Sequence, residues 1–374
     1  MGRAVPHPRK VRFAVVGLGY IGQIAVLPAF AHARRYAELV ALVSGDRSKA
    51  AQLARVYDVP AVYGYTEYER CLASGIDAVY LALPNSLHAE YAIRAARAGV
   101  HVLCEKPMAT TAYECEAMID AARVAKVRLM IAYRLHFEAG TLHAVDLAQS
   151  GRLGELRAFS SMFCAPVRDA ANTRLSATLG GGTLPDIGIY CINVARALFR
   201  DEPFEVYAAE AVGDAPRFGE VAEATTAVLR FPGDRLATFT CSFGGAATSS
   251  YHLVGTAGDL VVNPAYDFGG PIVHHVTIGG RSRTVRYPRR DQFAPELVHF
   301  ARCVLNERDP APSGAEGLAD VRIIDALRES VRCGCPVPLA QFDVPSRPDL
   351  AQEIHRPAIA EPPLIHAARP SGHN

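Results

Sequence analysis

The fold is decided by residues 11–22, which read Val-Arg-Phe-Ala-Val-Val-Gly-Leu-Gly-Tyr-Ile-Gly. The residues before the first glycine are mostly β-branched or aromatic and predict a short buried strand. Gly17 permits a tight turn, Gly19 lets backbone amides approach a pyrophosphate, and Gly22 lets a helix pack closely against the strand. The apolar run 23–30 predicts that helix, which Pro28 should kink or shorten. Strand, glycine turn and helix together indicate a dinucleotide-binding site.

Strand-like and helix-like runs alternate regularly from this turn to residue 133. The predicted helices cover residues 48–57, 66–73 and 111–125, and the predicted strands cover residues 39–43, 62–65, 78–83, 100–104 and 128–133. Such alternation is typical of a doubly wound parallel sheet. We therefore predict an α/β Rossmann domain over residues 10–134, with its ligands at the carboxyl ends of the strands.

The second predicted strand ends at Ser44, the place where a Rossmann domain distinguishes between dinucleotides. A carboxylate there selects NAD, because it accepts hydrogen bonds from the ribose diol. Here Gly45, Arg47 and Lys49 follow a hydroxyl, and this combination suits the 2′-phosphate of NADP. NAD stays the alternative, because a small shift in register would bring Asp46 to the strand tip. A solvated helix start explains Lys49 nearly as well.

Two further strand tips carry polar side chains. The strand over 78–83 runs into Pro84, Asn85 and His88, and the strand over 100–104 runs into Glu105 and Lys106. Taken alone, the last two residues are explained more simply as an exposed ion pair at an ordinary strand end. The carboxyl ends of parallel strands share one edge of the sheet, however, so both tips should converge where a nicotinamide would lie.

The pattern changes beyond residue 135. After one helix over 141–149, alternating apolar and polar residues predict strands over 156–163, 204–211, 225–231, 235–243 and 252–256. This pattern indicates an α+β region, with an open, mostly antiparallel sheet that carries helices on one face. We assign residues 135–340 to this region and residues 341–374 to a tail rich in proline and alanine. We expect the tail to be partly disordered or draped over a neighbouring subunit.

A helical segment interrupts this sheet pattern after three consecutive glycines, Gly180 to Gly182. Asp186, Tyr190 and Asn193 follow at spacings of four and three residues, which place their side chains on one helix face. Read alone, the segment is explained more simply as a capped helix whose tyrosine is hydrogen-bonded.

Composition argues against several classes of protein. The chain has 374 residues and a net charge of +1, so no nucleic acid or other polyanion is indicated as a partner. Its nine cysteines are scattered without a Cys-x-x-Cys spacing, which favours free thiols in a reducing cytoplasm. Cys333 and Cys335 lack histidine partners, and we predict no metal site. The sequence predicts no signal peptide and no membrane span.

These motifs together resemble the Gfo/Idh/MocA family of pyridine-nucleotide sugar oxidoreductases over about residues 10–340. Several stretches are similar to its glucose-fructose oxidoreductase branch, namely 42–45, 83–90, 104–110, 186–190, 316–317 and 320–322. The resemblance implies that Lys106 and Tyr190 form the catalytic pair and that Asp186 is a substrate ligand. It also implies a cis peptide bond between Lys106 and Pro107.

The family resemblance also implies roles for cofactor ligands. Ser44, Gly45 and Lys49 would hold the 2′-phosphate, the strand tip after residue 83 would line the cofactor, and Arg134 would reach the nicotinamide side. The whole predicted cofactor site comprises Gly17, Gly19, Tyr20, Ile21, Gly22, Ser44, Gly45, Arg47, Lys49, Tyr65, Leu83, Pro84, Asn85, His88, Glu105, Lys106 and Arg134. NADP is the predicted cofactor, and NAD is less favoured.

Two features depart from the family pattern. Many members carry histidine at the position of Tyr190, and a phenol, whose ordinary pKa is near ~10, needs a neighbouring cation such as Lys106 to act near neutrality. The glucose-fructose enzymes also resemble secreted forms with a long arm ahead of the Rossmann domain, whereas few residues precede Val11 here. Permanent cofactor retention and the oligomeric state that accompanies the arm are therefore left open.

These residues predict hydride transfer between NADP and the anomeric carbon of a cyclic aldose. Tyr190 would take the anomeric hydroxyl proton, Lys106 would stabilise the oxyanion, and Asp186 would hold sugar hydroxyls, giving an aldonolactone. In reverse, the same site would reduce an open-chain sugar. The alternatives are an NADP-binding sensor without catalysis and an NAD-dependent glycosidase on the same scaffold. We expect a cytoplasmic homodimer or homotetramer that associates through the C-terminal sheet.

Overall fold

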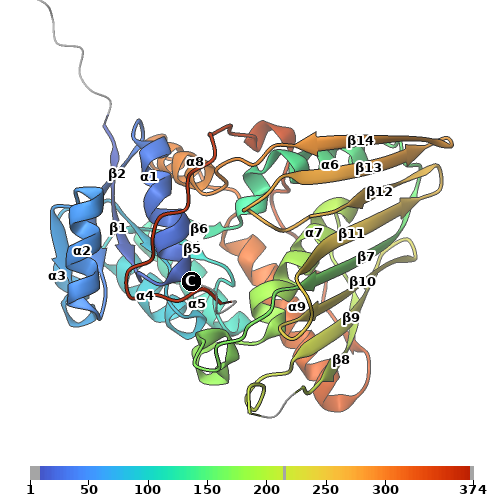
Figure 1. Cartoon of the computed structure of the whole chain (residues 1–374), viewed down its shortest axis with the longest axis horizontal. Helices are drawn as coiled ribbons and strands as arrows, with labels where there is room; N and C mark the ends of the chain where they lie inside the picture. Colours follow the sequence, from blue (N-terminus) through green and yellow to red (C-terminus); the bar gives the residue numbers. More distant parts are fainter. Residues whose placement is uncertain (1–8, 214–215, 371–374) are drawn as a thin grey trace, which may run out of the picture.

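Two β-sheets organise the molecule (Figure 1). The computed structural model describes residues 9–213 and 216–370. A six-stranded sheet has the order β3-β2-β1-β4-β5-β6, and a nine-stranded sheet has the order β14-β13-β12-β11-β7-β10-β9-β8-β15. The predicted fold class is confirmed, because a parallel Rossmann sheet is followed by a mostly antiparallel sheet with helices.

Every strand pair in the six-stranded sheet is parallel. The strands are β1 (Val11–Val16), β2 (Ala37–Val43), β3 (Ala61–Tyr63), β4 (Ala78–Leu81), β5 (His101–Glu105) and β6 (Leu129–Ala132). The helices between them are α1 (Leu27–Ala33), α2 (Arg47–Tyr57), α3 (Tyr68–Leu72), α4 (His88–Arg97) and α5 (Ala112–Ala125). Because the strand order reverses between β1 and β4, their carboxyl ends open a crevice for a ligand.

Strand β1 is buried on both faces. Phe13 and Val15 face a core shared with α1, α2 and a later helix, α8 (Ala294–Leu305), whereas Ala14 and Val16 face the core on the side of α4 and α5. A strand covered on both faces needs a nearly continuous apolar sequence, which is what residues 11–16 supply.

The first helix departs from regular geometry at the predicted place. Residues Gly22–Val26 form a widened π-turn, and regular α-helix begins at Leu27. Pro28 lies in the first turn of α1. It has no N–H to donate back into the preceding turn, which therefore widens.

The nine-stranded sheet is antiparallel except for the pair β7 and β10. Its strands are β7 (Leu156–Cys164), β8 (Glu205–Ala211), β9 (Ala224–Phe231), β10 (Arg235–Ser242), β11 (Thr248–Gly255), β12 (Gly258–Val262), β13 (Ile272–Ile278), β14 (Arg281–Tyr287) and β15 (Val337–Pro338). Helices α6 (Ala139–Gln149), α7 (Ile189–Phe199) and α9 (Gly314–Cys333) pack on one face. Alternate residues of the strands point away from these helices and are exposed.

Several elements of this region were not predicted, namely β12 to β15, α8 and α9. Strand β11 also begins at Thr248 instead of residue 252. Strand β14 shows why the pattern was missed, because it is a sheet edge whose residues are all exposed or half-buried. Without a buried face, its sequence has no apolar alternation to detect.

The C-terminal tail contacts its own chain over residues 341–370, and its predicted contact with a neighbouring subunit stays a prediction. These residues lie along the chain's own surface, and the last of them, dark red in Figure 1, cross the front of the Rossmann sheet beside α1. The predicted disorder of residues 371–374 lies outside the described residues.

Among the residues that the structure describes, no helix is both long and apolar enough to cross a bilayer. All nine cysteines are free thiols. Cys333 and Cys335 are exposed at the end of α9, and the other seven cysteines are buried.

Candidate active site

One cleft collects most of the predicted site residues. Its volume is about 1210 Å³, and it lies where the carboxyl ends of the Rossmann strands face the nine-stranded sheet. The Rossmann side contributes the glycine turn and the strand tips, and the other side contributes Asp186, Tyr190 and the loops 164–174 and 263–269. Of the predicted cofactor residues, all line this cleft except Gly22, Gly45, Arg47 and His88.

The glycine turn has the shape that a pyrophosphate needs. Gly17 has φ +94°, and a Cβ there would lie 2.4 Å from the Ala82 carbonyl oxygen. A Cβ on Gly22 would lie 2.9 Å from the Gly17 carbonyl oxygen. By contrast, a Cβ on Gly19 would meet no atom within 4 Å, because this glycine borders the open cleft. The turn is thus closed where strand and helix pack and open where a phosphate would approach.

Two cations after β2, Arg47 and Lys49, were predicted to act together, but only Lys49 lines the cleft. Ser44 and Lys49 line the cleft, and the Ser44 hydroxyl accepts a hydrogen bond of 3.2 Å from the Asp46 amide. Arg47 instead forms a 2.6 Å ion pair with Glu67 and lies outside the cleft lining. Asp46 caps α2 by accepting from the Lys49 amide at 2.9 Å. A helix-capping carboxylate is a structural use for the residue that had kept NAD open as the alternative.

His88 is buried beneath the cleft and does not line it. Its Nδ1 lies 2.8 Å from the Pro107 carbonyl oxygen and its Nε2 lies 3.0 Å from the Leu83 carbonyl oxygen. Burial lowers the pKa of His88, although the two carbonyl contacts oppose this shift. The imidazole therefore ties the loops after β4 and β5 together, while Asn85 reaches across the cleft mouth and donates to the Gly180 carbonyl at 2.8 Å.

Glu105 and Lys106 are not an exposed surface pair. Glu105 is 8% exposed, and its carboxylate accepts a 2.8 Å hydrogen bond from the Tyr80 hydroxyl. Burial raises the pKa of Glu105, and the Lys106 cation opposes that rise. The peptide bond between Lys106 and Pro107 is cis, as the family resemblance implied.

Lys106 reaches from the Rossmann sheet to the other side of the cleft. Its Nζ donates to the Asp186 carbonyl oxygen at 2.6 Å and lies 3.3 Å from Asp186 Oδ1. Arg174 Nε donates to the other carboxylate oxygen at 2.7 Å. Burial alone would raise the pKa of Asp186, but the Arg174 and Lys106 cations outweigh it and hold that pKa below its usual value. Both oxygens of Asp186 therefore already have cationic partners.

The ring of Tyr190 lies between two cations. Lys106 Nζ and the Arg134 guanidinium carbon each lie 4.9 Å from the ring centroid. Phe163 meets the ring edge-on at 5.7 Å, and Tyr266 lies 6.1 Å away. The Tyr190 ring is thus held between two aromatic side chains and two cations.

Arg134 is 5% exposed and donates to the Gln292 side-chain oxygen and to the Tyr266 carbonyl. These contacts fix its guanidinium against Tyr190 and against Phe268, whose ring centroid lies 5.2 Å away. The resemblance had assigned Arg134 to the nicotinamide side, and the structure places it on the cleft lining beside the predicted catalytic tyrosine.

Asn193 does not share the cleft with Asp186 and Tyr190. It is 4% exposed, and its amide donates at 2.9 Å to both Glu316 and Asp320 on α9. Tyr190 and Asn193 both lie on regular α7, which follows the π-turn Leu184–Gly188 that carries Asp186. At 3.6 residues per turn, a spacing of three residues rotates a side chain by about 60° from its neighbour's direction, and Asn193 points toward α9 instead of the cleft.

Three cleft residues were missed by the sequence interpretation: Arg174, Tyr266 and Gln292. Arg174 and Tyr266 fall within loops that had no periodic pattern, and Gln292 lies just before α8. Each becomes recognisable only through its contact with Asp186, Tyr190 or Arg134.

Models of known protein families match most of the chain. Residues 11–133 match an oxidoreductase family with an NAD-binding Rossmann fold, and residues 116–261 match the GFO/IDH/MocA C-terminal domain. A D-xylose 1-dehydrogenase (NADP(+)) of Haloferax volcanii is 34% identical over 331 residues, which cover 87% of this chain and 99% of that protein.

Two solved structures are similar over nearly their whole length. An aldose-aldose oxidoreductase from Caulobacter crescentus, complexed with glycerol, is 37% identical with a TM-score of 0.84 and is matched over 88% of this chain and 100% of that one. A 3-ketoreductase from Actinomadura kijaniata, in complex with NADP and TDP-benzene, is 29% identical with a TM-score of 0.79 and is matched over 86% and 98%.

Proposed function

This chain belongs to the Gfo/Idh/MocA family of oxidoreductases, and we propose that it is an NADP-dependent sugar oxidoreductase. Its reaction is the oxidation of a cyclic aldose at the anomeric carbon to an aldonolactone, coupled to the reduction of a second sugar. The observation that carries this proposal is the meeting of Lys106, Asp186 and Tyr190 in one cleft with the glycine turn.

The cleft residues fit a dinucleotide that carries a 2′-phosphate. The open side of Gly19 is a cradle for the pyrophosphate, and Ser44 and Lys49 supply a hydroxyl and a cation at the ribose end. The names of the relatives, an NADP(+) dehydrogenase and a ketoreductase complexed with NADP, support the same cofactor. NADP, when bound, accepts a hydride from the sugar carbon and returns it to a second carbonyl. Arg47 is not part of the proposed site, because Glu67 holds it outside the cleft.

The proposed chemistry assigns one task to each reacting side chain. The Tyr190 oxygen, in its phenolate form, takes the proton of the anomeric hydroxyl as the C–H bond is cleaved and becomes the neutral phenol. The Lys106 ammonium stabilises the oxygen from which that proton leaves. Asp186 orients Lys106, because its carboxylate is already engaged by Lys106 and Arg174. This last role replaces direct binding of sugar hydroxyls as the proposed task of Asp186.

The substrate side of the cleft suits a polyhydroxyl compound. Phe163 and Phe268 offer aromatic surface to the apolar face of a sugar ring. Asn172, Asp267 and the neighbouring loop residues offer polar groups for its hydroxyls. A small sugar beside a dinucleotide also agrees with the volume of about 1210 Å³, which exceeds the usual size of a pocket for one drug-sized ligand.

The outer face of the nine-stranded sheet is the surface through which we propose homodimer or homotetramer formation. Met162 on β7, Leu236 on β10 and Tyr207 on β8 are 43%, 47% and 39% exposed on this face. Exposed apolar side chains on a broad sheet are typical of subunit interfaces. The cytoplasmic location predicted from the scattered thiols stays a prediction.

The proposal is tested with a panel of aldoses and ketoses, supplied with NADP or with NAD. With an aldose alone, the expected result is reduction of NADP, measured by its absorbance, together with lactone formation. With the aldose and a second sugar together, lactone and the reduced second sugar should form without net accumulation of reduced NADP. NADP binding without any sugar-dependent reduction would support the sensor alternative instead. Release of an aglycone from a glycoside without net nucleotide reduction would support the glycosidase alternative.

A further inference from the structure

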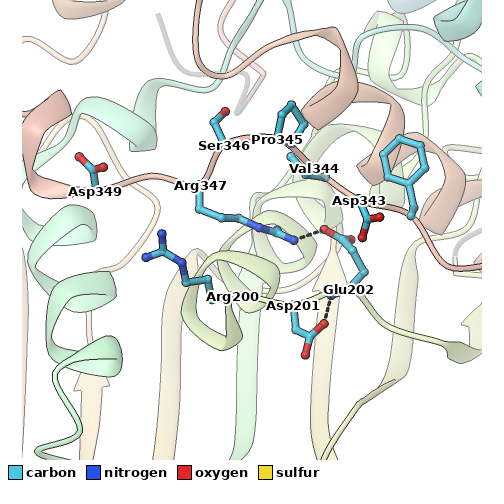
Figure 2. Close-up of a pocket in the computed structure, with 10 residues that line it drawn as sticks. Arg200, Asp201, Glu202, Asp343, Val344, Pro345, Ser346, Arg347 and Asp349 are labelled. Atoms are coloured by element: carbon cyan, nitrogen blue, oxygen red, sulfur yellow. Dashed lines mark hydrogen bonds and ion pairs between the residues drawn. The ribbon is translucent and has the colours of Figure 1, made fainter.

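The C-terminal tail is fastened to the body of the protein before it reaches the cleft. Figure 2 shows its first anchor, where Arg347 forms a 2.6 Å ion pair with Glu202 beyond the end of α7. Glu202 also binds Arg196, a fully buried arginine that pairs with Glu316 and Asp320 of α9. The tail is therefore tied to a buried ionic network of the substrate region and does not lie loosely on the surface.

A second set of anchors carries the tail to the Rossmann side. Gln352 donates to the Ala311 carbonyl at 2.9 Å, and Arg356 donates to the His32 carbonyl at the end of α1 at 3.0 Å. Arg289 then donates to the Ile359 carbonyl at 2.9 Å. Beyond this point the chain turns over the cleft, and we call residues 359–370 the strap.

The strap is hooked directly onto the glycine turn. Gln23, which is 1% exposed, donates to the Ile365 carbonyl at 2.9 Å and accepts from the Ile365 amide at 2.8 Å. The same Gln23 amide nitrogen donates to the Leu18 carbonyl within the turn at 2.9 Å. The buried Gln23 side chain therefore both donates to and accepts from the backbone of the strap. These two hydrogen bonds form only when the strap lies in this position.

Two strap side chains reach the parts of the cleft where phosphates would lie. His366 Nδ1 lies 2.9 Å from Asp46 Oδ2, beside Ser44 and Lys49. Its φ of 46° is left-handed, which is uncommon outside glycine, so the contacts of the strap hold this turn in place. Arg369 pairs with Glu361 at 3.0 Å, and both act electrostatically on Tyr20 of the glycine turn.

The strap ends on the opposite wall of the cleft. The Arg168 amide, in the loop after β7, donates to the Pro370 carbonyl at 3.2 Å. Ile359, Glu361 and the run from His366 to Pro370 line the same cavity as Lys106. The cavity keeps its volume of about 1210 Å³ beneath them, so the strap forms a roof over the cleft and does not fill it.

We propose that the strap is part of the NADP site and controls nucleotide exchange. This inference rests on the proposed cofactor. His366 adds an imidazole side chain that can hydrogen-bond at the 2′-phosphate end, and Arg369 adds a cation at the pyrophosphate end. NADP enters and leaves only when residues 359–370 lift from Gln23, so one nucleotide serves successive oxidation and reduction half-reactions without being released.

The first test measures nucleotide release from a chain that ends after Ala358, which retains the anchors at Arg347, Gln352 and Arg356. NADPH dissociation is followed by stopped-flow fluorescence after displacement with excess NADP, without any sugar. The expected result is release at least about tenfold faster than from the full chain, since ordered lids of this kind gate release. Unchanged release would overturn the strap proposal. Tighter equilibrium binding of NADPH by the truncated chain would identify the strap as a plug and overturn the proposal as well.

The same measurement separates the strap from the proposed function. If the full chain binds no NADPH, the cofactor assignment fails; if it binds NADPH but the truncation changes nothing, only the strap fails. Limited thermolysin digestion of the full chain supplies a second readout, because this protease cleaves before isoleucine and the strap contains Ile359 and Ile365. NADP should slow cleavage at these sites at least about tenfold if it stabilises the closed strap. Equal cleavage with and without NADP would contradict the proposal.

Point variants locate the contribution of each side chain. His366→Ala should weaken NADPH binding about fivefold and leave NADH binding unchanged, because only NADPH has the 2′-phosphate. Arg369→Ala should weaken the binding of both NADPH and NADH. The matched control is His355→Ala, a tail histidine that is exposed outside the cleft and contacts Glu353. If His366→Ala and His355→Ala behave alike, His366 has no part in the site.

Discussion

The cofactor side of the cleft takes its side chains from the ends of parallel strands, whereas the substrate side takes them from segments that meet only in the folded chain. Gly17, Ser44 and Lys106 each follow a strand of the six-stranded sheet, and the register of that sheet brings the strand ends to one edge. Arg174 and Tyr266 stand on loops that reach the cleft from different parts of the nine-stranded sheet. Local order thus builds one side, and long-range packing builds the other.

The largest expected effect comes from Lys106, because this residue follows a Rossmann strand and contacts the substrate side of the cleft. Lys106→Ala removes the ammonium that contacts Asp186 and faces Tyr190, and turnover should fall about 10³-fold. NADPH binding should change little, since the glycine turn and the 2′-phosphate end are untouched. Steady-state turnover and equilibrium binding of NADPH check both parts. Turnover within about tenfold of the wild type would contradict the assignment of Lys106.

Tyr190→Phe tests the substrate side alone. The phenyl ring keeps the contacts with Phe163 and with the flanking cations and loses only the hydroxyl. Turnover should fall about 10²-fold, the usual contribution of a positioned acid or base. NADPH binding and the melting temperature should stay near the wild-type values. If the variant retains near-normal turnover, another group transfers the proton.

Asp186→Asn tests whether this residue orients Lys106 or binds the sugar. If it orients Lys106, turnover should fall about tenfold and KM should change little, because the affected cation acts in the transition state. A large rise in KM with unchanged turnover would show that Asp186 binds the sugar instead.

Asp186→Asn should also lose a contribution to the free energy of unfolding that depends on pH in the acid range. Since the folded-state pKa of Asp186 is depressed, that contribution is present above the unfolded-state pKa near ~3.9 and is lost as pH falls through the folded value.

Lys49 and Arg47 form a matched pair on the cofactor side, because they lie two residues apart but only Lys49 lines the cleft. Lys49→Met should raise the Kd for NADP about tenfold and leave the Kd for NAD unchanged, since it removes a cation near the 2′-phosphate. Arg47→Met should leave both values within about twofold, because Arg47 pairs with Glu67 at the exposed surface. Equal effects of the two substitutions on the Kd for NADP would contradict the assignment of Lys49, and not Arg47, to the 2′-phosphate.

The smallest expected effect concerns His274 on β13, at the core of the substrate side. It is 2% exposed, and burial lowers its pKa to about 4. His143, His275 and Arg283 face it and lower the pKa further, while a Gly140 backbone contact opposes the shift. The neutral ring contributes stability above the unfolded-state pKa near ~6.5, and this is lost as pH falls toward the folded value.

His274→Gln should therefore flatten the acid side of the stability profile by about 1 kcal/mol between pH 6.5 and 5.5. Urea unfolding at these two pH values measures the difference. The control is His252→Gln, which replaces an exposed histidine that contacts Asp259 on the same sheet. An identical pH dependence in the two variants would show that burial of His274 does not matter.

The comparison also explains which site residues the sequence predicted. Gly17, Ser44, Asn85 and Lys106 were recognisable because each follows an apolar strand, and strand ends in a parallel sheet have one possible location. Position along the chain does not fix which way a side chain points, however. His88 follows the end of β4, as Asn85 does, yet it is buried between two carbonyls. Arg47 follows the end of β2, as Ser44 does, yet it pairs with Glu67 outside the cleft.

The substrate side was predicted only where a resemblance named its residues. Asp186 and Tyr190 reach the cleft as expected, but Asn193, three residues further along α7, points toward α9 and donates to two carboxylates there. Arg174 had no signal, since an arginine in an irregular loop is ordinarily a solvated charge. The role of Arg174 is recognisable only from its hydrogen bond to the buried Asp186 carboxylate.

By itself, the sequence determined the Rossmann sheet, the glycine turn and the strand tips that line the cofactor side, because each depends on short-range periodicity and on the shared edge of parallel strands. Only the tertiary structure decided that Arg174 and Lys106 share Asp186, that two cations flank Tyr190, and that the C-terminal strap crosses the cleft. These contacts join residues far apart in the chain. No local pattern encodes them, since they form only when two sheets and a tail have packed together.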